Sequence, residues 1–511
     1  MTASTNAPKV TVVVPAYNSG PHIENLVTSL LRQSLPAGEF EAVFVDDGST
    51  DSTGARLDEL AAAHPHFRVL HIDNSGWPSR PRNLGVEHAR GEYVFFADDD
   101  DWFGEEALER LYACATAHDA DLVIGKMAGH RRSVPRELFR RNRFDATLEN
   151  APLIDSLTAH KLFRRSFLVE HDLRFPEGKR RLEDHVLVTR AYFLSRRTCV
   201  LADYVCYHHQ RRTDAGNVTA TALEPAGYFV NLREALDIVD AHTTPGPLRD
   251  RLHRRWLRNE MVSRLRGRRL LDAPADWVDQ LVDEARRVIR DRFAPGVAAG
   301  LPPLQRIITR LIEQGRTADL RRLARWETAV RATATVQRVA PAGTSLTVAL
   351  TAELCSGDRP LTLTADGEQR LLVVPVDDLP ADLRDATTGV KQSRLDVVAR
   401  RRDTREEFFV PVTGTVELVP SDDDTVRLVQ HGTARLDSGT LNGGRSRGTW
   451  DLKARVTSCG WTEDTPLPVA FRCAADGAPP VVVPHPGSLR FRLRRAVARR
   501  VPESIRRAIR R

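Results

Sequence analysis

The chain has 511 residues, more than one hydrophobic core usually covers, so two or three domains are expected. Hydrophobic residues make up 41% and charged residues 28% of the sequence, which excludes a mainly disordered chain. The net charge of +7 comes from the C-terminus, because residues 488–511 hold ten arginines and one glutamate and the rest of the chain sums to −2. We therefore expect no nucleic-acid binding by the body of the protein.

Membrane insertion and secretion are not expected either. No run approaches the roughly 18–20 apolar residues that cross a bilayer. The N-terminus, MTASTNAPKVTVVV, lacks the basic and apolar segments of a secretory signal. Six cysteines without CxxC spacing favour neither a zinc site nor a disulfide framework, and they fit a reducing cytoplasm.

Short apolar runs alternate with helical segments over the first hundred residues. The runs are 9–15, 40–46, 67–72 and 92–97, and the helical segments are 23–33, 54–63 and 82–89. This alternation predicts a doubly wound, Rossmann-like α/β fold with a mostly parallel sheet. Ligands bind such sheets at the carboxyl ends of the strands, so the residues directly after each run are the candidates for a site.

Four consecutive carboxylates, Asp98 to Asp101, follow the run that ends at Ala97. Adjacent carboxylates repel one another, so the fold needs a cation there or full solvation. In an extended chain Asp98 and Asp100 point the same way, which suits a hard divalent metal that also binds phosphate oxygens. The alternative is a solvated acidic turn, and the position after a buried strand favours the metal.

The other strand ends carry polar or aromatic residues as well. Asp47 is followed by Gly48, which allows a tight turn, and by residues that can cap a helix. Tyr17 and the backbone around it could line a nucleotide base. The proline-rich loop 74–85 carries two arginines that could contact a diphosphate. Each feature alone could equally be a helix cap or a surface loop.

Together, the segments VPAYNSGPHIENLVTSLLRQSL, VFVDDGSTDST and SGWPSRPRNLGVEHARGEYVFFADDDDW resemble the inverting family 2 glycosyltransferases of the GT-A fold. The resemblance covers residues 9–215 and implies a nucleotide-sugar donor, usually a UDP-sugar, and Mn²⁺ or Mg²⁺ as cofactor. The uracil contacts that it implies are Pro15, Ala16, Tyr17 and Asp47. It further implies that Arg82 contacts the nucleotide region or helps to order the loop.

On the same resemblance, Asp98 and Asp100 correspond to the Asp-x-Asp motif that contacts ribose and coordinates the metal. Asp99 stands where the family often has a small residue, which leaves open which of the carboxylates touches the metal. We place Asp99 with Asp98 among the donor contacts. The segment Tyr207–Arg212 matches a place where similar enzymes complete the metal and diphosphate shell with histidine or arginine. His209 is the preferred metal ligand there, while His208, the arginines and a simple surface histidine stay open.

Direct displacement at an anomeric carbon needs a base opposite the leaving UDP, while a metal stabilises the departing diphosphate. In the family this base is an acidic residue within a Glu-Asp pair. The pair Glu183-Asp184 lies where a basic loop leads into an apolar-periodic helix. We assign the base to Asp184 with Glu183 as its neighbour; the alternative is a pair that only stabilises the helix dipole.

Beyond the predicted catalytic domain, residues 1–221, the pattern changes twice. Residues 222–330 are helical and arginine-rich, and residues 331–485 show the two-residue period and turns of a β-sandwich. This order resembles the bacterial wall teichoic acid glycosyltransferases, which modify polyol-phosphate polymers. In those relatives the C-terminal domains mediate oligomerisation, commonly as trimers, so the resemblance implies a homo-oligomer.

The C-terminal tail, residues 486–511, is basic with an apolar stripe at helical spacing. Such a helix lies on anionic lipid, where each charge contributes on the order of 1 kcal/mol. The alternative is a solvated tail or one bound to polymer phosphates. Lipid contact would place the protein at the inner face of the plasma membrane, where carriers of wall polymers are exposed.

We therefore expect a metal-assisted hexosyltransferase that acts on a teichoic-acid-like polymer of the cell envelope. One alternative keeps the enzyme and changes the acceptor to a capsular or exopolysaccharide unit or a small molecule. Another is a non-catalytic envelope scaffold, which the complete acidic motifs argue against.

Overall fold

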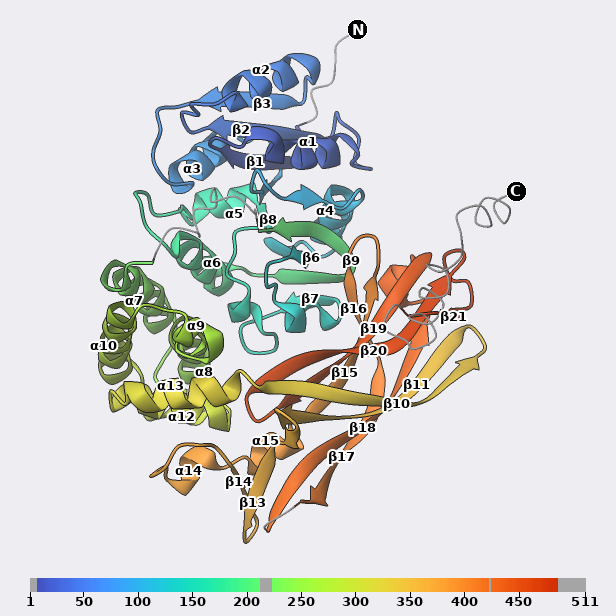
Figure 1. Ribbon diagram of the computed structural model, residues 1–511. Coiled ribbons are helices and arrows are strands. Elements are labelled where there is room, and N and C mark those ends of the chain that lie inside the picture. The colour runs from blue at the N-terminus through green and yellow to red at the C-terminus, as the bar shows by residue number, and fades with distance from the viewer. Residues whose placement is uncertain (1–6, 212–222, 422–423, 486–511) are drawn as a thin grey trace, which may run out of the picture. The chain divides into compact units, whose positions relative to one another are not determined.

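The computed structural model describes residues 7–211, 223–421 and 424–485, and the chain divides into two compact units (Figure 1). Unit 1 comprises Met1–Ser263 and Pro274–Gly300, and unit 2 comprises Arg264–Ala273 and Leu301–Arg511. The backbone thus passes between the units three times within the helical region. The domain boundaries drawn from the sequence, at 221/222, 330/331 and 485/486, stay predictions, and the basic tail lies outside the described residues.

A mixed nine-stranded sheet forms the centre of unit 1, in the order β3-β2-β1-β4-β8-β6-β9-β5 with β7 beside β9. The strands are β1 (Val10–Ala16), β2 (Phe40–Asp46), β3 (Phe67–His71), β4 (Tyr93–Phe96), β5 (Trp102–Phe103), β6 (Leu122–His130), β7 (Arg143–Ala146), β8 (Leu162–Arg164) and β9 (Thr198–Gln210). The first four strands are parallel, whereas β8 runs antiparallel to both of its neighbours. All of β2 and all of β1 except the half-buried Pro15 are buried, as expected for strands covered on both faces.

Helices fill the connections of this sheet. They are α1 (Ile23–Leu31), α2 (Thr53–Ala63), α3 (Ser79–His88), α4 (Ala107–Ala117), α5 (Arg165–Glu170) and α6 (Glu183–Leu194). The predicted α/β fold class is confirmed, including the four strands and three helices of the first hundred residues. In the parallel register Ala16 pairs with Asp46, so the ends of β1 and β2 lie side by side.

The helical region contributes to both units. Its elements are α7 (Pro225–His242), α8 (Pro247–Trp256), a π-helical turn η5 (Leu257–Met261), α9 (Gly267–Leu271), α10 (Ala275–Arg292), α11 (Pro295–Ala299), α12 (Pro303–Glu313) and α13 (Thr317–Glu327). Of these, α9, α12 and α13 belong to unit 2 and the others to unit 1. In unit 1, α7 packs against α6 and α10. No helix within the described ranges is long and apolar enough to span a membrane.

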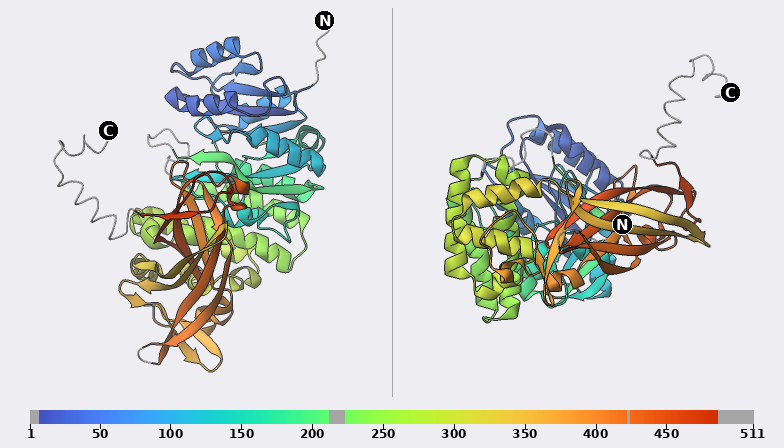
Figure 2. Two further views of the ribbon diagram at one scale, coloured as in Figure 1. Left: turned by 90° about the vertical axis from the view of Figure 1, so that its right-hand side faces the viewer. Right: turned by 60° about the horizontal axis from the view of Figure 1, so that its bottom comes forward.

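Unit 2 contains two antiparallel sheets, which confirms the predicted β-rich C-terminal part. One has the order β10-β11-β18-β13-β14, with β12 beside β11 and β17 beside β18, and the other has the order β16-β15-β19-β20-β21. Their strands are β10 (Val330–Ala342), β11 (Ser345–Ser356), β12 (Arg359–Pro360), β13 (Thr362–Asp366), β14 (Gln369–Leu372), β15 (Arg394–Arg401), β16 (Glu407–Val410), β17 (Val412–Pro420), β18 (Thr425–Asp437), β19 (Gly448–Ser458), β20 (Trp461–Cys473) and β21 (Val481–Val483). Figure 2 shows these long strands in yellow to red from two further sides. Two short helices, α14 (Ala381–Arg384) and α15 (Thr387–Lys391), precede β15.

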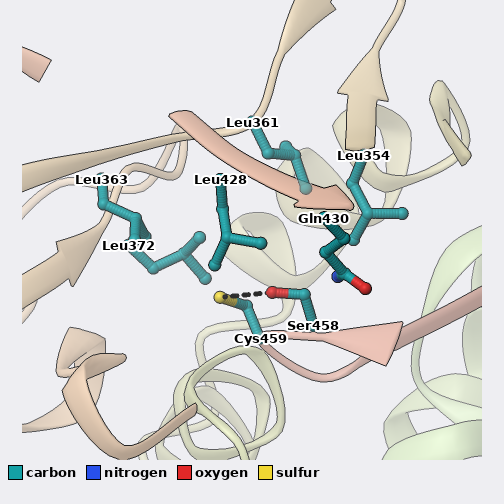
Figure 3. Close-up of a pocket in the computed structure, with 8 residues that line it drawn as sticks. All are labelled: Leu354, Leu361, Leu363, Leu372, Leu428, Gln430, Ser458 and Cys459. Carbon is teal, nitrogen blue, oxygen red and sulfur yellow. Dashed lines mark hydrogen bonds between the residues drawn. The ribbon is translucent and has the colours of Figure 1, made fainter. Parts of the chain in front are cut away.

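A small pocket in unit 2 is lined by five leucines together with Gln430, Ser458 and Cys459 (Figure 3). The hydroxyl of Ser458 donates to Cys459 Sγ at 3.4 Å, and the Gln430 amide donates to the carbonyl oxygen of Thr457 at 3.4 Å. No charged side chain lines the pocket. We therefore assign this pocket to the packing of the sheets.

Candidate active site

The turn after β2 is tied to the loop before α3. The carboxylate of Asp47 accepts hydrogen bonds from the backbone N–H and the hydroxyl of Ser75, at 2.7 and 2.9 Å. Its own N–H donates to the carbonyl oxygen of Ala16 at 2.9 Å. Gly48 has a φ of +69°, and a Cβ there would lie 2.7 Å from the backbone nitrogen of Asn74, so the close approach needs glycine. Burial raises the pKa of Asp47, although the Ser75 bonds oppose this.

These contacts bring the predicted uracil-binding residues to one edge of the sheet. Pro15 and Ala16 end β1, Asp47 follows β2, and the ring of Tyr17 next to them is 48% exposed. An exposed aromatic face beside a buried carboxylate can stack on and hydrogen-bond a planar base. The assignment to uracil stays a prediction.

Arg82, near the start of α3 (Ser79–His88), links two acidic segments. Its guanidinium donates to Asp98 Oδ1 at 2.7 Å and to Glu183 Oε1 at 3.5 Å, and it lies 5.2 Å from the ring centre of Phe175. Burial would lower the pKa of Arg82, but the charges of Asp98 and Glu183 raise it, so the group stays charged. The structure thus engages Arg82 with carboxylates, and its predicted contact with the nucleotide stays a prediction.

The four carboxylates after β4, which we name the acidic turn (residues 98–101), are not extended. The N–H of Asp101 donates to the carbonyl oxygen of Asp98 at 3.3 Å, which folds the segment into a turn. Asp99 accepts a hydrogen bond from the hydroxyl of Ser19, and Asp100 is buried. The expected common direction of Asp98 and Asp100 assumed an extended chain, and this geometric argument therefore does not hold.

Four side chains converge beside this turn, and we name them the metal cluster: Asp98, Asp101, His160 and His209. One ligand atom from each lies within 4.8 Å of the others. Within the described part of the chain, neither ring nitrogen of His209 has a hydrogen-bond partner, and Asp101 Oδ2 has none either. Burial lowers the pKa of His160 to about 4 and that of His209 well below its usual value, so both imidazoles are neutral and able to bind metal.

The pKa values of the two carboxylates of the cluster are shifted in opposite directions. Burial alone would raise the pKa of Asp98, but its electrostatic interactions with His160 and Arg82 outweigh burial and hold that pKa below its ordinary range. Burial and repulsion by Asp98 and Asp100 raise the pKa of Asp101 well above its ordinary value. A bound cation would offset the repulsion among these carboxylates. The unpartnered ring nitrogens of His209 and the unpartnered Oδ2 of Asp101 therefore fit a divalent metal. A mixed histidine and carboxylate set suits Mn²⁺ better than Mg²⁺. Asp100 is not among the four, and its predicted role as a ligand stays a prediction.

His208 and His209 point to opposite faces of β9, as neighbouring residues of a strand do. His208 Nδ1 lies 3.0 Å from His130 Nε2, and its ring stacks on Trp102 with centres 5.0 Å apart. His209 instead faces His160, with ring centres 5.0 Å apart. The geometry therefore favours His209 over His208 as the metal ligand.

The first turn of α6 carries Glu183 and Asp184, and the residue before it, Leu182, has a left-handed φ of +64°. Such a conformation costs a non-glycine residue about 1–3 kcal/mol and is concentrated at functional sites. Asp184 is partly buried and accepts a hydrogen bond from the N–H of His185 at 3.1 Å. Burial and the charge of Glu183 raise the pKa of Asp184 to about 7, against the opposing charges of nearby cations. A carboxylate with this pKa can accept a proton near neutral pH.

Comparisons with known proteins match two regions of the chain to family models. Residues 11–174 match the family model described as glycosyl transferase family 2, and residues 225–324 match that of the glycosyl transferase TarS linker domain. The chain carries a family 2 glycosyltransferase domain. The resemblance found in the sequence, to GT-A enzymes of family 2 and to wall teichoic acid glycosyltransferases, is thereby confirmed.

Named relatives of this glycosyltransferase domain act on polyol phosphates. Poly(ribitol-phosphate) β-N-acetylglucosaminyltransferase TarS of Staphylococcus aureus is 32% identical over 303 residues, which are 58% of this chain and 52% of the relative. Poly(ribitol-phosphate) β-glucosyltransferase of Bacillus spizizenii is 32% identical over 235 residues, 46% of this chain and 37% of the relative. The chain thus spans about half or less of the length of these relatives.

Solved structures of S. aureus TarS are similar as well. The crystal structure of TarS 1-349 in complex with UDP-GlcNAc matches with a TM-score of 0.55 and 26% identity, over 66% of this chain and 96% of that one. A structure titled TarS without residue bounds matches with a TM-score of 0.53 and 20% identity over 94% of this chain and 86% of that one, which shows the fold alone.

Three residues of the candidate site were not predicted from the sequence: Asp101 as a metal-cluster member, His160 and Lys161. Lys161 is fully buried, its ammonium donates to the carbonyl oxygen of Thr158, and burial lowers its pKa to about 7 against the charge of Asp184. The segment AHKLFRR places His160 and Lys161 directly before β8 (Leu162–Arg164). Two basic side chains at the start of a buried strand were the available signal, since buried charges need partners.

Proposed function

We propose that the protein transfers a hexose or N-acetylhexosamine from a UDP-sugar to a hydroxyl of a polyol-phosphate polymer of the cell envelope, with inversion at the anomeric carbon. The observation that carries the proposal is the bridge made by Arg82, which binds Asp98 of the metal cluster and Glu183 beside Asp184. This bridge joins a candidate diphosphate site to a candidate base. The names of the TarS and Bacillus relatives support the acceptor and point to UDP-GlcNAc and UDP-glucose as donors.

In this reaction Asp184 takes the proton of the acceptor hydroxyl. The acceptor oxygen forms its bond to the anomeric carbon as the bond between that carbon and the UDP oxygen breaks. When bound, a divalent cation stabilises the negative charge on the departing diphosphate. Asp98, Asp101, His160 and His209 would hold it, while Arg82 keeps Asp98 ionised and fixes the distance between the acidic turn and α6.

The proposal is tested by UDP release from UDP-GlcNAc and UDP-glucose in the presence of a synthetic ribitol-phosphate oligomer. We expect release from one of the two donors and a β-linked product. A panel of other UDP-sugars and a capsular oligosaccharide serve as controls for donor and acceptor. No release from any donor, together with no UDP binding by calorimetry, would support the scaffold alternative instead.

Two further proposals come from the sequence and the resemblance. We propose that residues 488–511 attach the protein to anionic lipid at the inner face of the plasma membrane, and that the C-terminal sheets support a homo-oligomer.

A chain that lacks residues 488–511 is expected to lose binding to phosphatidylglycerol vesicles in a flotation assay while it keeps its turnover of soluble substrates. Neutral phosphatidylcholine vesicles are the control, and undiminished binding by the shortened chain would refute the role of the tail. Light scattering of the intact chain measures the oligomer.

A further inference from the structure

A buried ion pair connects the helical region to the turn that carries Asp184. Arg255 lies next to the end of α8 (Pro247–Trp256) and is 8% exposed. Its guanidinium donates to Glu260 Oε1 at 2.7 Å and lies 3.5 Å from Nε2 of His185, the residue after Asp184. Glu260 is buried as well and accepts a second hydrogen bond from the hydroxyl of Tyr228 on α7. All these residues belong to unit 1.

The pairing of Arg255 with Glu260 depends on an uncommon backbone turn. The two residues are five apart, and in an α-helix such residues lie about 140° apart around the axis, too far to form an ion pair. Here residues 257–261 form the π-helical turn η5, whose wider winding brings them to one side. Turns of this type are rare in proteins, and those that occur are often found at functional sites.

A buried ion pair adds little to the stability of a fold, because the cost of desolvating the two charges offsets much of their attraction. Its position suggests another role. The charged groups that face Asp184 are Glu183 on its own helix, Arg82 from α3, Lys161 from the segment before β8 and Arg255 from α8. Arg82 comes from α3 and pairs with Asp98 and Glu183. Arg255, which pairs with Glu260, is the arginine that the helical region contributes to the surroundings of Asp184.

We propose that Arg255 is a positioning residue for Asp184: held by Glu260, it fixes the first turn of α6 through His185 and keeps a permanent positive charge facing the base. This inference rests on the proposed function. It gives the helical segment that matches the linker model a direct effect on the protonation of the base. Burial and Glu183 raise the pKa of Asp184, and the charge of Arg255 opposes them. Without that charge the pKa rises further, so Asp184 holds its proton to a higher pH.

The test is the pH dependence of kcat/KM for UDP release, measured with the full chain, the productive donor and the ribitol-phosphate oligomer. In Arg255→Met, the pH of half-maximal rate on the acid side is expected to rise by about one unit, which is about a tenfold loss at pH 6 and a much smaller loss at pH 9. Arg255→Lys keeps the charge and should restore most of the profile. Arg254→Met is the matched control, because Arg254 lies on the same helix and donates to the carbonyl oxygens of Gly296 and Val297 instead.

A profile of Arg255→Met that keeps the wild-type midpoint while kcat falls would overturn the inference and leave Arg255 a structural residue. If Arg255→Met does not fold, Arg255→Gln decides by the same measurement, since it keeps hydrogen-bond donors without the charge. The fate of the proposed function is read separately from Asp184→Asn. If Asp184→Asn still transfers the sugar, Asp184 is not the base and the inference about Arg255 fails with it. If Asp184→Asn loses transfer but the pH profiles of the Arg255 variants match that of the wild type, only the inference about Arg255 fails.

Discussion

Replacement of Asp184 by Asn is expected to lower sugar transfer by about 10²- to 10⁴-fold, the usual contribution of a general base, while UDP binding stays unchanged. The amide has nearly the shape of the carboxyl but cannot take the proton of the acceptor hydroxyl. Wild-type transfer should rise with pH through about 7, because burial and Glu183 raise the pKa of Asp184 to about 7 and only the ionised form accepts a proton. UDP release and calorimetry with UDP measure the two effects.

Stability provides the control for this variant. The ordinary pKa of the carboxyl is 3.8, so Asp184 stabilises the fold below that pH and loses its contribution as the pH rises through about 7. Asparagine does not ionise, and the thermal midpoint of Asp184→Asn at pH 8 should therefore be no lower than that of the wild type. Turnover close to the wild-type rate in a folded variant would move the base to another residue.

Chelation of divalent cations with EDTA is expected to stop transfer, and added Mn²⁺ to restore it. His209→Ala removes a buried ligand of the metal cluster and should weaken Mn²⁺ binding in the presence of UDP by at least about 10- to 100-fold, the effect seen even for residues around metal ligands. Titration calorimetry with MnCl₂ and UDP measures this affinity directly.

His208→Ala is the matched control for the metal prediction. His208 is the neighbouring residue on β9 (Thr198–Gln210) and is buried as well, but it contacts Trp102 and His130. We expect Mn²⁺ affinity within about threefold of the wild type in this variant, since no ligand is lost. Equal losses at both positions, or full activity in EDTA, would contradict the assignment of the metal cluster.

The residues that follow local rules could be predicted from the sequence. Apolar runs between helical segments gave β1 to β4 and their helices, and an acidic pair before an apolar-periodic segment gave the start of α6. The path of the acidic turn could not be predicted in this way. The segment turns at the hydrogen bond between Asp101 and Asp98, and Asp98 lies with Asp101 in the metal cluster instead of with Asp100. Strand periodicity says nothing about a segment that has left the strand.

His160 and Lys161 show the second limit. They join the site because β8, three residues long, enters the sheet antiparallel between β4 and β6. Strand insertion of this kind is decided by tertiary packing, and a run of three residues carries too little periodicity to reveal it. The ion pair of Arg255 and Glu260 was hidden for a similar reason, since helical spacing places residues five apart on different sides.

The three backbone crossings within the helical region bear on how such proteins exchange parts during evolution. Because residues 264–273 belong with the C-terminal sheets while residues 274–300 return to the N-terminal unit, no single recombination point separates the two units. An exchange at residue 300 would leave α9 behind, with its buried Leu270 deprived of α13. Inheritance of the C-terminal sheets therefore requires inheritance of this short segment as well.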